Sequence, residues 1–570
     1  MEESVFDIPL LLDEISKYLS ESDLRACIRV SRIWSARFIP ILWRTVDFSS
    51  RNLIYNLNTF SKGQTHVRTI KIRSLWFFEG IVSSYGHKHI FYFHFPNLRS
   101  LQWTFDFVGC QDPMSINLAL DFFKDHPTLQ DISFGFEIIT RELIIILDKS
   151  NLPALRSFGL IGSTNIKDDS SVQQLIRACA RLETLNITID RYEDHHEEPN
   201  IDLYQERKAI MEDMPTTRLR CLSIDLRCPS QEAVTLVPLL RKSPLLQELR
   251  IHFSPGNDMS RSIATILRDE GCCPELRTLS IMQDKITDSE LAELINACTS
   301  HTSLSGNHRS SLITTTSNKV HRNLKDLTIA SKNYGPLTIN SLAQNCAQNL
   351  VALNIVECEY VHFSDFIAIV SNLSGLKKLV VDKIYLVSRF QRGTNALINA
   401  LEIPWVCRDL MYLGFDLSWE MKIYSYDDSD TEDDDNTDDM IDLANFRDRA
   451  LGCFFDRVGE LKNLRHISYD GRYIPLLSRS GNENELSYLD RLRDLKKIQT
   501  LRVDRTILGV KEAAWLILHW PNLSQISGLW RKHADDCPCK TRFILICKRP
   551  FEQGEGITVL KAAKPWIIVE

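Results

Sequence analysis

The stretch Leu324–Ile329, with the sequence LKDLTI, contains the motif that decides the fold: apolar, two residues, apolar, one residue, apolar. The motif returns at Leu350 and Leu376, so these three copies begin 26 residues apart (324, 350 and 376). We number its places from one to six, with apolar residues at places one, four and six. Further copies begin at Leu98, Leu129, Leu155, Leu182, Leu219, Leu246, Leu276, Leu410, Leu464, Ile498 and Leu523, and a weaker one at Val67. A period of this length is typical of a solenoid.

The fourth and sixth places predict a strand, because residues two apart on a strand point to the same side. One such strand cannot bury its apolar side alone, so parallel strands must stack row upon row. The residues between two copies carry the chain back, and several of these segments predict helices. In Thr287–Ile295, a capping threonine precedes two acidic residues and apolar residues at helical spacing.

This pattern resembles the leucine-rich repeat, and the resemblance covers most of the chain. It implies an α/β solenoid with parallel strands on its concave face and helices and loops on its convex face. Four cysteines resemble those of the cysteine-containing subclass, at Cys179, Cys298, Cys346 and Cys358.

The composition excludes several classes of function. The 570 residues include 67 Lys and Arg and 74 Asp and Glu, and a formal charge of −7 is mild for this length. It gives no support for binding to nucleic acid or to a membrane surface. We see no secretory signal and no apolar run of about 18 residues, so the 15 cysteines are expected to be reduced thiols in the cytoplasm or nucleus.

Residues 1–46 do not fit the repeat and predict a separate unit of three short helices. Pro9 suits the first turn of a helix, and Ser20 or Ser22 can cap a second helix. Pro40 is expected to end or kink the third. The unit has more apolar surface than about 40 residues can enclose. A strand at residues 45–48 follows without a linker, so the solenoid should begin directly after the helices.

This N-terminal unit resembles an F-box. The matching residues are Ile8-Pro9, Ile15, Tyr18-Leu19, Asp23-Leu24, Val30-Ser31, Trp34, Leu42-Trp43 and Val46. The resemblance implies docking on the Skp adaptor of a cullin-based ubiquitin ligase, through Ile8, Pro9, Leu11, Ile15, Leu19, Leu24, Val30 and Trp34. Some of these residues, Leu24, Val30 and Trp34 above all, have the alternative role of packing the unit itself.

We divide the rest of the chain into a solenoid at 47–530 and a C-terminal cap at 531–570. The acidic stretch at 426–440 is expected to be disordered, because it combines self-repulsion with few apolar residues. Ser429 and Thr431 within it are weak matches to the phosphorylation sites of an acid-directed kinase. The stretch at 194–198 is read as a solvated loop rather than as a metal cluster. In the cap we expect strands at 542–547 and 556–560. Ordinary thiols are favoured there over a zinc site at His533, Cys537, Cys539 and Cys547.

The sequence shows no catalytic motif in a supporting context, so we predict no catalytic site, no cofactor and no metal. What remains is recognition by the strand faces, through the fifth place and the residue after the sixth, which we call the seventh place. Candidate substrate-binding residues there are Arg250, His252, Asp382, Asp416, Asp470, Arg502 and Asp504.

The seventh places of the four copies that begin at Leu376, Leu410, Leu464 and Ile498 are all aspartate, which predicts a carboxylate stripe for a basic peptide or domain. The alternative is a hydrated acidic surface with basic neighbours. For the whole protein we expect the substrate receptor of an SCF-type ubiquitin ligase, which binds a Skp adaptor and through it a cullin. The alternative is a leucine-rich-repeat scaffold without a ubiquitin role.

Overall fold

The fold is taken from a computed structural model of the chain. It describes residues 9–47, 63–72, 94–103, 121–134, 141–147, 152–162, 171–189, 201–226, 229–252, 259–269, 272–282, 286–299, 324–331, 333–356, 358, 361–385, 402–418, 449–470, 487–506, 508–529 and 555–569.

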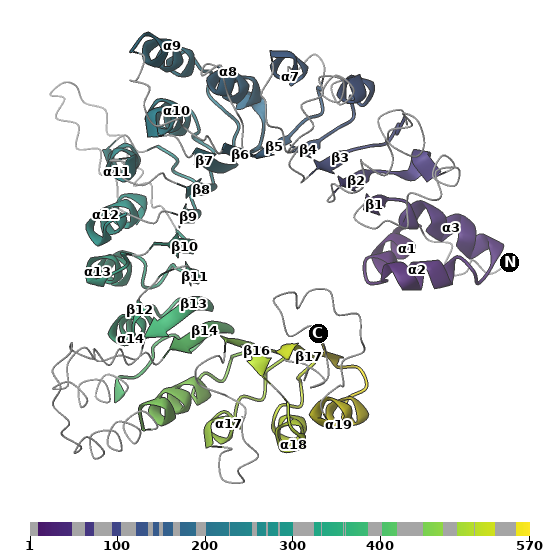
Figure 1. The fold of residues 1–570 in the computed structure, drawn as a ribbon, viewed down its shortest axis with the longest axis vertical. Coiled ribbons are helices and arrows are strands. Elements are labelled where there is room, and N and C mark those ends of the chain that lie inside the picture. The colour runs from purple at the N-terminus through teal and green to yellow at the C-terminus, as the bar shows by residue number, and fades with distance from the viewer. Residues whose placement is uncertain are drawn as a thin grey trace, which may run out of the picture. The chain divides into compact units, whose positions relative to one another are not determined.

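The chain divides into two compact units. The first comprises Met1–Met259 and Glu270–Glu275, and the second comprises Ser260–Asp269 and Leu276–Glu570. Each unit contains its own ladder of parallel strands with helices along one side of it (Figure 1).

The first unit begins with three helices and continues as a parallel ladder in which each strand pairs with the next. The register aligns equal places of the motif, so that Ile70 lies beside Leu101 and Leu101 beside Ile132. Its helices are α1 (Pro9–Ser16), α2 (Glu21–Cys27), α3 (Arg32–Leu42), α7 (Arg141–Ile146), α8 (Ser171–Ala178), α9 (Ile201–Glu212) and α10 (Pro229–Arg241). Its strands are β1 (Thr45–Asp47), β2 (Thr69–Ile72), β3 (Ser100–Trp103), β4 (Asp131–Phe134), β5 (Ser157–Gly162), β6 (Thr184–Ile189), β7 (Cys221–Leu226) and β8 (Glu248–His252).

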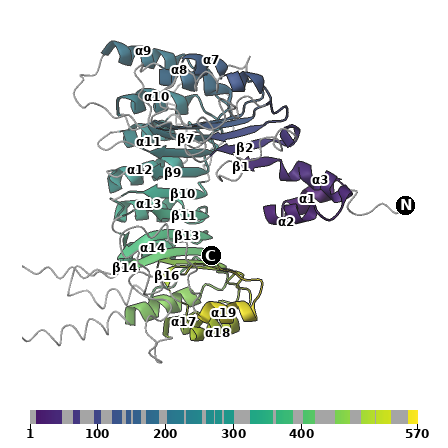
Figure 2. The same cartoon turned by 45° about the vertical axis from the view of Figure 1, so that its right-hand side comes forward.

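The second unit repeats this arrangement, and Figure 2 shows β9, β10, β11 and β13 stacked as rungs with α12 and α13 beside them. Its strands are β9 (Thr278–Met282), β10 (Asp326–Ala330), β11 (Ala352–Val356), β12 (Val361–His362), β13 (Lys378–Tyr385), β14 (Tyr412–Ser418), β15 (His466–Asp470), β16 (Thr500–Thr506), β17 (Gln525–Leu529) and β18 (Ile568–Val569). Its helices are α12 (Asp288–Thr299), α13 (Pro336–Asn345), α14 (Phe363–Asn372), α17 (Ser487–Arg491), α18 (Val510–His519) and α19 (Glu555–Ala563), and α11 (Met259–Asp269) belongs to it except for its first residue.

The core of each ladder consists of the apolar places of the motif. In β10, Leu327 and Ile329 are fully buried, while Thr328 between them is only partly buried, which is the alternation that a half-exposed strand requires. The predicted subclass cysteines are buried as well. Burial raises the pKa of the Cys179 and Cys346 thiols to about 12, so these groups act as small apolar residues rather than as nucleophiles.

Local sequence signals are confirmed at several helix ends. The α1 helix begins at Pro9, and Ser20 caps α2 by accepting a hydrogen bond from the N–H of Asp23. Thr287 and Glu290 exchange the hydrogen bonds of a capping box in front of α12. By contrast, α3 passes through Pro40 and ends two residues later, at Leu42.

The predicted strand at 556–560 is wrong, because this segment lies in helix α19. Its β-branched residues favoured a strand, but Ile557 and Leu560 are three residues apart and both buried, which suits one face of a helix. Gly556 allows a close approach to α18, since a Cβ there would lie 2.4 Å from the carbonyl oxygen of Gly509. Tertiary packing therefore overrides local preference. The other predicted cap strand, at 542–547, lies outside the described residues.

Candidate functional site

The N-terminal helices form the first candidate interaction surface. Ser20 caps α2 and Ser31 caps α3, so both turns between helices are closed by local hydrogen bonds. A hydrogen bond from Ser20 lowers the pKa of the Asp23 carboxyl group, which completes the capping box. Short loops and capped ends hold the three helices together in spite of their small size.

The core of this helical unit is small. Leu12, Leu24 and Phe38 are its buried apolar residues, one from each helix, and the ring centroid of Trp34 lies 5.6 Å from that of Phe38. Partly buried residues packed against this core include Leu19, Cys27, Ile28, Trp34, Ile41 and Leu42.

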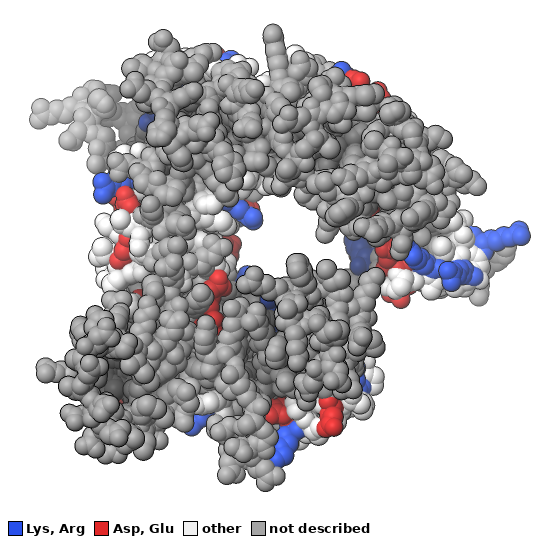
Figure 3. Space-filling view, in the orientation of Figure 1, with Lys and Arg blue, Asp and Glu red and all other residues white. Residues whose placement is uncertain are grey.

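Large apolar side chains remain exposed around this core. Leu11 on α1 is 37% exposed, and Val30, between α2 and α3, is 64% exposed. Tyr18 and Ile33 are also exposed, at 85% and 65%. Figure 3 shows uncharged surface (white) beside basic (blue) and acidic (red) side chains on this unit.

The eight predicted adaptor-binding residues therefore separate into groups. Leu11 and Val30 are exposed, and Leu24 lies in the small core. Ile15, Leu19 and Trp34 are partly buried. Pro9 starts α1, and Ile8 lies outside the described residues. Sequence reasoning missed the exposed Ile33, although its position one residue before the packed Trp34 places it on another side of α3.

The helical unit leads directly into the ladder, as its sequence predicts. The carbonyl oxygen of Arg44 accepts hydrogen bonds from the N–H groups of Arg68, at 2.9 Å, and Thr69, at 3.0 Å. A Cβ on Gly63 would lie 2.6 Å from the ring of Trp43, so this indole packs directly on the glycine backbone. Backbone bonds and an aromatic contact thus join α3 to the first strands.

The exposed strand face of the first unit contains two of the predicted substrate-binding residues, and both interact with acidic neighbours. Arg250 forms an ion pair with Glu248 on the same strand, at 2.6 Å. The Nδ1 atom of His252 lies 3.1 Å from a carboxylate oxygen of Asp225, its register partner on β7. Any ligand at this place competes with these internal pairs.

The aspartate row of the second unit is aligned by backbone register. Asp416 pairs with Asp470, and Asp470 with Asp504, on three successive strands. The register between β13 and β14 shifts between Val381 and Ile384, which is a bulge that interrupts the alignment at Asp382. Backbone pairing therefore brings three of the four predicted aspartates into one row, with the fourth beside the bulge.

The accessibility of these predicted residues is uneven. Asp382 and Arg502 are exposed, whereas Asp416 is only 6% exposed and is a poor contact for a ligand. The side chains of Asp470 and Asp504 lie outside the described set.

A further polar row on the second unit was not predicted. Lys378, Tyr412 and His466 are register partners at the third place of the motif. The ammonium group of Lys378 lies 5.4 Å from the centre of the Tyr412 ring, which lies 5.9 Å from the His466 ring. Burial and the nearby Arg465 lower the pKa of His466. The third place carries no hydrophobic signal, so only register reveals this row.

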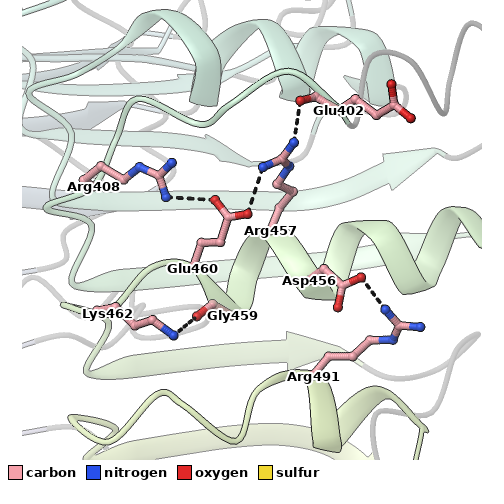
Figure 4. A network of polar contacts seen from close by, with 8 residues as sticks. All are labelled: Glu402, Arg408, Asp456, Arg457, Gly459, Glu460, Lys462 and Arg491. Atoms are coloured by element: carbon pink, nitrogen blue, oxygen red, sulfur yellow. Dashed lines mark hydrogen bonds and ion pairs between the residues drawn. The ribbon is translucent and has the colours of Figure 1, made fainter.

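A polar network supports the return segment in front of β15 (Figure 4). Glu460 accepts hydrogen bonds from Arg408, at 2.9 Å, and Arg457, at 2.8 Å, and Arg457 also reaches the carbonyl oxygen of Glu402. Burial would raise the pKa of Glu460, but the two arginines outweigh it and hold that pKa below its ordinary value. Nearby, Arg491 pairs with Asp456 and Lys462 donates to the carbonyl of Gly459. The network fixes the segment that positions the aspartate row.

Several predicted features lie outside the described residues: the acidic stretch with Ser429 and Thr431, the loop at 194–198, and His533, Cys537, Cys539 and Cys547. Within the described ranges no group of three or more His, Cys, Asp or Glu side chains could hold a metal ion. Among the described helices, none combines the length and the apolar character that crossing a bilayer requires.

Parallel strands that mostly recur at about 25 to 37 residues, with helices returning on one side, define an α/β solenoid of the leucine-rich-repeat type.

No family model and no curated protein matches the chain. Among solved structures it is similar to the TLR13–ssRNA13 complex, at 11% identity and a TM-score of 0.31, covering 90% of this chain and 60% of the TLR13 chain. The chain thus spans less than two thirds of that neighbour's length. It is similar to a leucine-rich-repeat protein of Leptospira interrogans (14% identity, 79% of this chain, 92% of the other, TM-score 0.22). It is also similar to the Rad7–Elc1 complex of yeast (12% identity, 94% of this chain, 96% of the other, TM-score 0.31). Similarity at this level does not bear on function.

Proposed function

We propose that this protein is the substrate-recognition subunit of an SCF-type ubiquitin ligase. Its helical unit binds a Skp-type adaptor and through it a cullin, and its strand faces bind a protein substrate. The chain itself supplies no covalent chemistry. It raises the effective concentration of the substrate beside the ubiquitin-transfer machinery.

One observation carries the proposal: the helical unit exposes large apolar side chains that its own core does not need. Leu12, Leu24 and Phe38 already fill that core, while Leu11 and Val30 remain exposed. Several exposed large apolar groups on so small a unit favour contact with a protein partner. The direct connection to the ladder also suits a receptor, because a substrate must be held in a defined direction.

Substrate binding is assigned to the strand faces. Asp382 is the accessible aspartate beside the register-aligned row of Asp416, Asp470 and Asp504, and it favours a basic peptide. Hydrogen-bond donors elsewhere on these faces come from Arg250, His252 and Arg502. Replacement of Asp382 and Asp504 by Ser should reduce the yield of substrate in proximity labelling with a stalled ligase. An unchanged set of labelled proteins would contradict this assignment.

The adaptor contact is tested by co-purification from cells with the double variant Leu11→Asp/Val30→Asp. Both side chains are exposed, so the fold should persist while the apolar contact is lost. Burial of a whole Leu or Val side chain contributes about 1.5–3 kcal/mol. If the adaptor buries half of each side chain, the double variant should weaken adaptor binding by about 10- to 150-fold, enough to reduce the adaptor and cullin in the eluate strongly.

The matched control is Leu337→Asp/Leu518→Asp, which changes two exposed leucines of α13 and α18 in the second unit. It should retain the adaptor in full. Equal adaptor recovery with both double variants would refute the assigned surface. Absence of any Skp-type adaptor with the unchanged protein would favour the second candidate, a leucine-rich-repeat scaffold without a ubiquitin role. The cytoplasmic or nuclear location, the lack of catalysis and the lack of a cofactor stay predictions.

A further inference from the structure

The second place of the motif, at the N-terminal edge of each strand, carries a row of arginines in the first unit. Arg68, Arg99 and Arg156 precede β2, β3 and β5, and all three side chains are exposed. The strand between, β4, follows Gln130 instead. Further along the first unit the second places carry Glu183, Arg220 and Gln247, and those of the second unit include Val351, Met411 and Gln499 as well as basic residues.

Backbone hydrogen bonds fix the spacing of this row. The carbonyl oxygen of Arg68 accepts from the N–H groups of Arg99, at 2.8 Å, and Ser100, at 2.9 Å. The carbonyl of Gln130 likewise accepts from Arg156 and from the residue after it, at 2.8 and 2.9 Å. Neighbouring strands lie about 4.8 Å apart, so the three arginines span about 14 Å along one edge. The backbone positions of the three arginines are therefore fixed before any ligand arrives.

Each arginine is followed by a hydroxyl residue at the third place. These are Thr69, Ser100 and Ser157, all partly buried. Among the residues that the structure describes, none of these hydroxyls makes a hydrogen bond, and none of the three guanidinium groups makes an ion pair. The row therefore presents donors in excess. Two acidic residues lie beside the row, Asp131 at a third place and the exposed Glu183 at the second place before β6. Burial raises the pKa of Asp131, although the nearby Arg156 acts in the opposite direction.

The chemistry of the row identifies its ligand as an acceptor-rich anion. Guanidinium groups bind carboxylates through two parallel hydrogen bonds, and the neighbouring hydroxyls add further donors. A single-stranded nucleic acid would also need aromatic side chains on which bases stack. The third and fifth places of β2 to β5 carry only Thr, Lys, Ser, Gln, Asp and Gly. A carboxylate-rich peptide is the ligand that fits.

We propose that the arginine row formed by Arg68, Arg99 and Arg156 binds an extended acidic segment of a partner protein. This inference goes beyond the proposed function, because it requires neither the adaptor nor the aspartate row of the second unit. It adds a binding surface of opposite charge on the first unit.

The test measures fluorescence anisotropy of a labelled peptide of twelve glutamates with the full-length protein at 50 and 150 mM NaCl. Arg68→Gln/Arg99→Gln/Arg156→Gln should weaken binding about tenfold, because three exposed charge pairs are lost. Binding should also weaken with salt. The charge-matched control, Arg493→Gln/Lys511→Gln/Lys561→Gln in the second unit, should stay within about twofold of the unchanged protein.

Three results would overturn the inference. The first is that the glutamate peptide does not bind at 50 mM NaCl, and the second is that the arginine-row variant and the control bind it equally. The third is that a twelve-nucleotide uridine oligomer binds more tightly than the glutamate peptide and that the arginine-row variant loses this binding. A twelve-glutamine peptide should not bind. If the triple variant aggregates, the same anisotropy titration is carried out with the three single variants, each of which should bind the glutamate peptide more weakly than the unchanged protein. Adaptor co-purification should be unaffected by the row, so failure here and failure of the proposed function are separate outcomes.

Discussion

Asp288 stabilises a helix that lies fifty residues further along the chain, and its replacement should loosen that helix selectively. The α13 helix has Gly335 at its N-cap and no side-chain cap of its own. The carboxylate of Asp288, on α12, accepts instead from the N–H groups of Leu337 and Thr338, both at 2.9 Å, and from the Thr338 hydroxyl, at 2.6 Å. A Cβ on Gly335 would lie 2.8 Å from the same carboxylate, so the glycine leaves room for it.

The size of the destabilisation follows from the hydrogen-bond donors of α13 that lose their acceptor. Loss of a cap costs about 0.5–2 kcal/mol, and a hydrogen bond to a charged group contributes about 1.5–3 kcal/mol. Because Thr338 is fully buried, water cannot replace its lost acceptor well. We expect Asp288→Ala to destabilise α13 by about 3 kcal/mol. Asp288→Asn keeps one acceptor oxygen and should cost about 1 kcal/mol.

Hydrogen exchange measures the effect where it arises. In Asp288→Ala the amides of Leu337 and Thr338 should exchange about 100-fold faster, since about 1.4 kcal/mol corresponds to a factor of ten. The matched control on the same helix is Glu293→Ala, which removes only an exposed ion pair with Arg268 and should leave these amides unchanged. Unchanged protection of both amides in Asp288→Ala would refute the role of this carboxylate.

Three further predictions concern packing and pH. His126 is buried, accepts from the N–H of Phe95 through Nε2 and contacts a carbonyl through Nδ1, and burial lowers its pKa below 6.5. The contribution of neutral His126 to stability should be complete above pH 6.5 and should be lost as the pH falls below 6.5. In thermal melts between pH 7.5 and 5, the melting temperature of His126→Gln should therefore fall less with decreasing pH than that of the unchanged protein. Gly63→Ala should lower the free energy of unfolding in denaturant titrations by about 1–3 kcal/mol, because the added methyl group would overlap the Trp43 ring. An unchanged midpoint of unfolding would argue against that contact. The ring centroid of Phe454 lies within 6.0 Å of those of five other aromatic side chains. Phe454→Ala should lower the free energy of unfolding by about 3–5 kcal/mol but Phe454→Leu by under about 1.5 kcal/mol, and equal losses would contradict this packing.

The helix ends and the strands of the repeated motif could be predicted from the sequence where the interactions that form them are local. Ser20 and Thr287 cap helices because their hydroxyls reach backbone groups three residues away. The motif at Leu327 and Ile329 specifies a strand because alternate residues share a side. The segment at 556–560 was mispredicted because its helix depends on α18, which is distant in sequence.

The amino-acid sequence by itself determined the kind of architecture here, since a repeated apolar pattern can be satisfied only when equal units stack. Tertiary structure alone decided which polar groups meet: the carboxylate of Asp288 at a helix fifty residues away, the bulge beside Asp382, and the arginines aligned along one edge. The physical reason is that strand register and helix contact bring distant residues within hydrogen-bonding range, and the spacing of polar residues along the chain does not encode those distances.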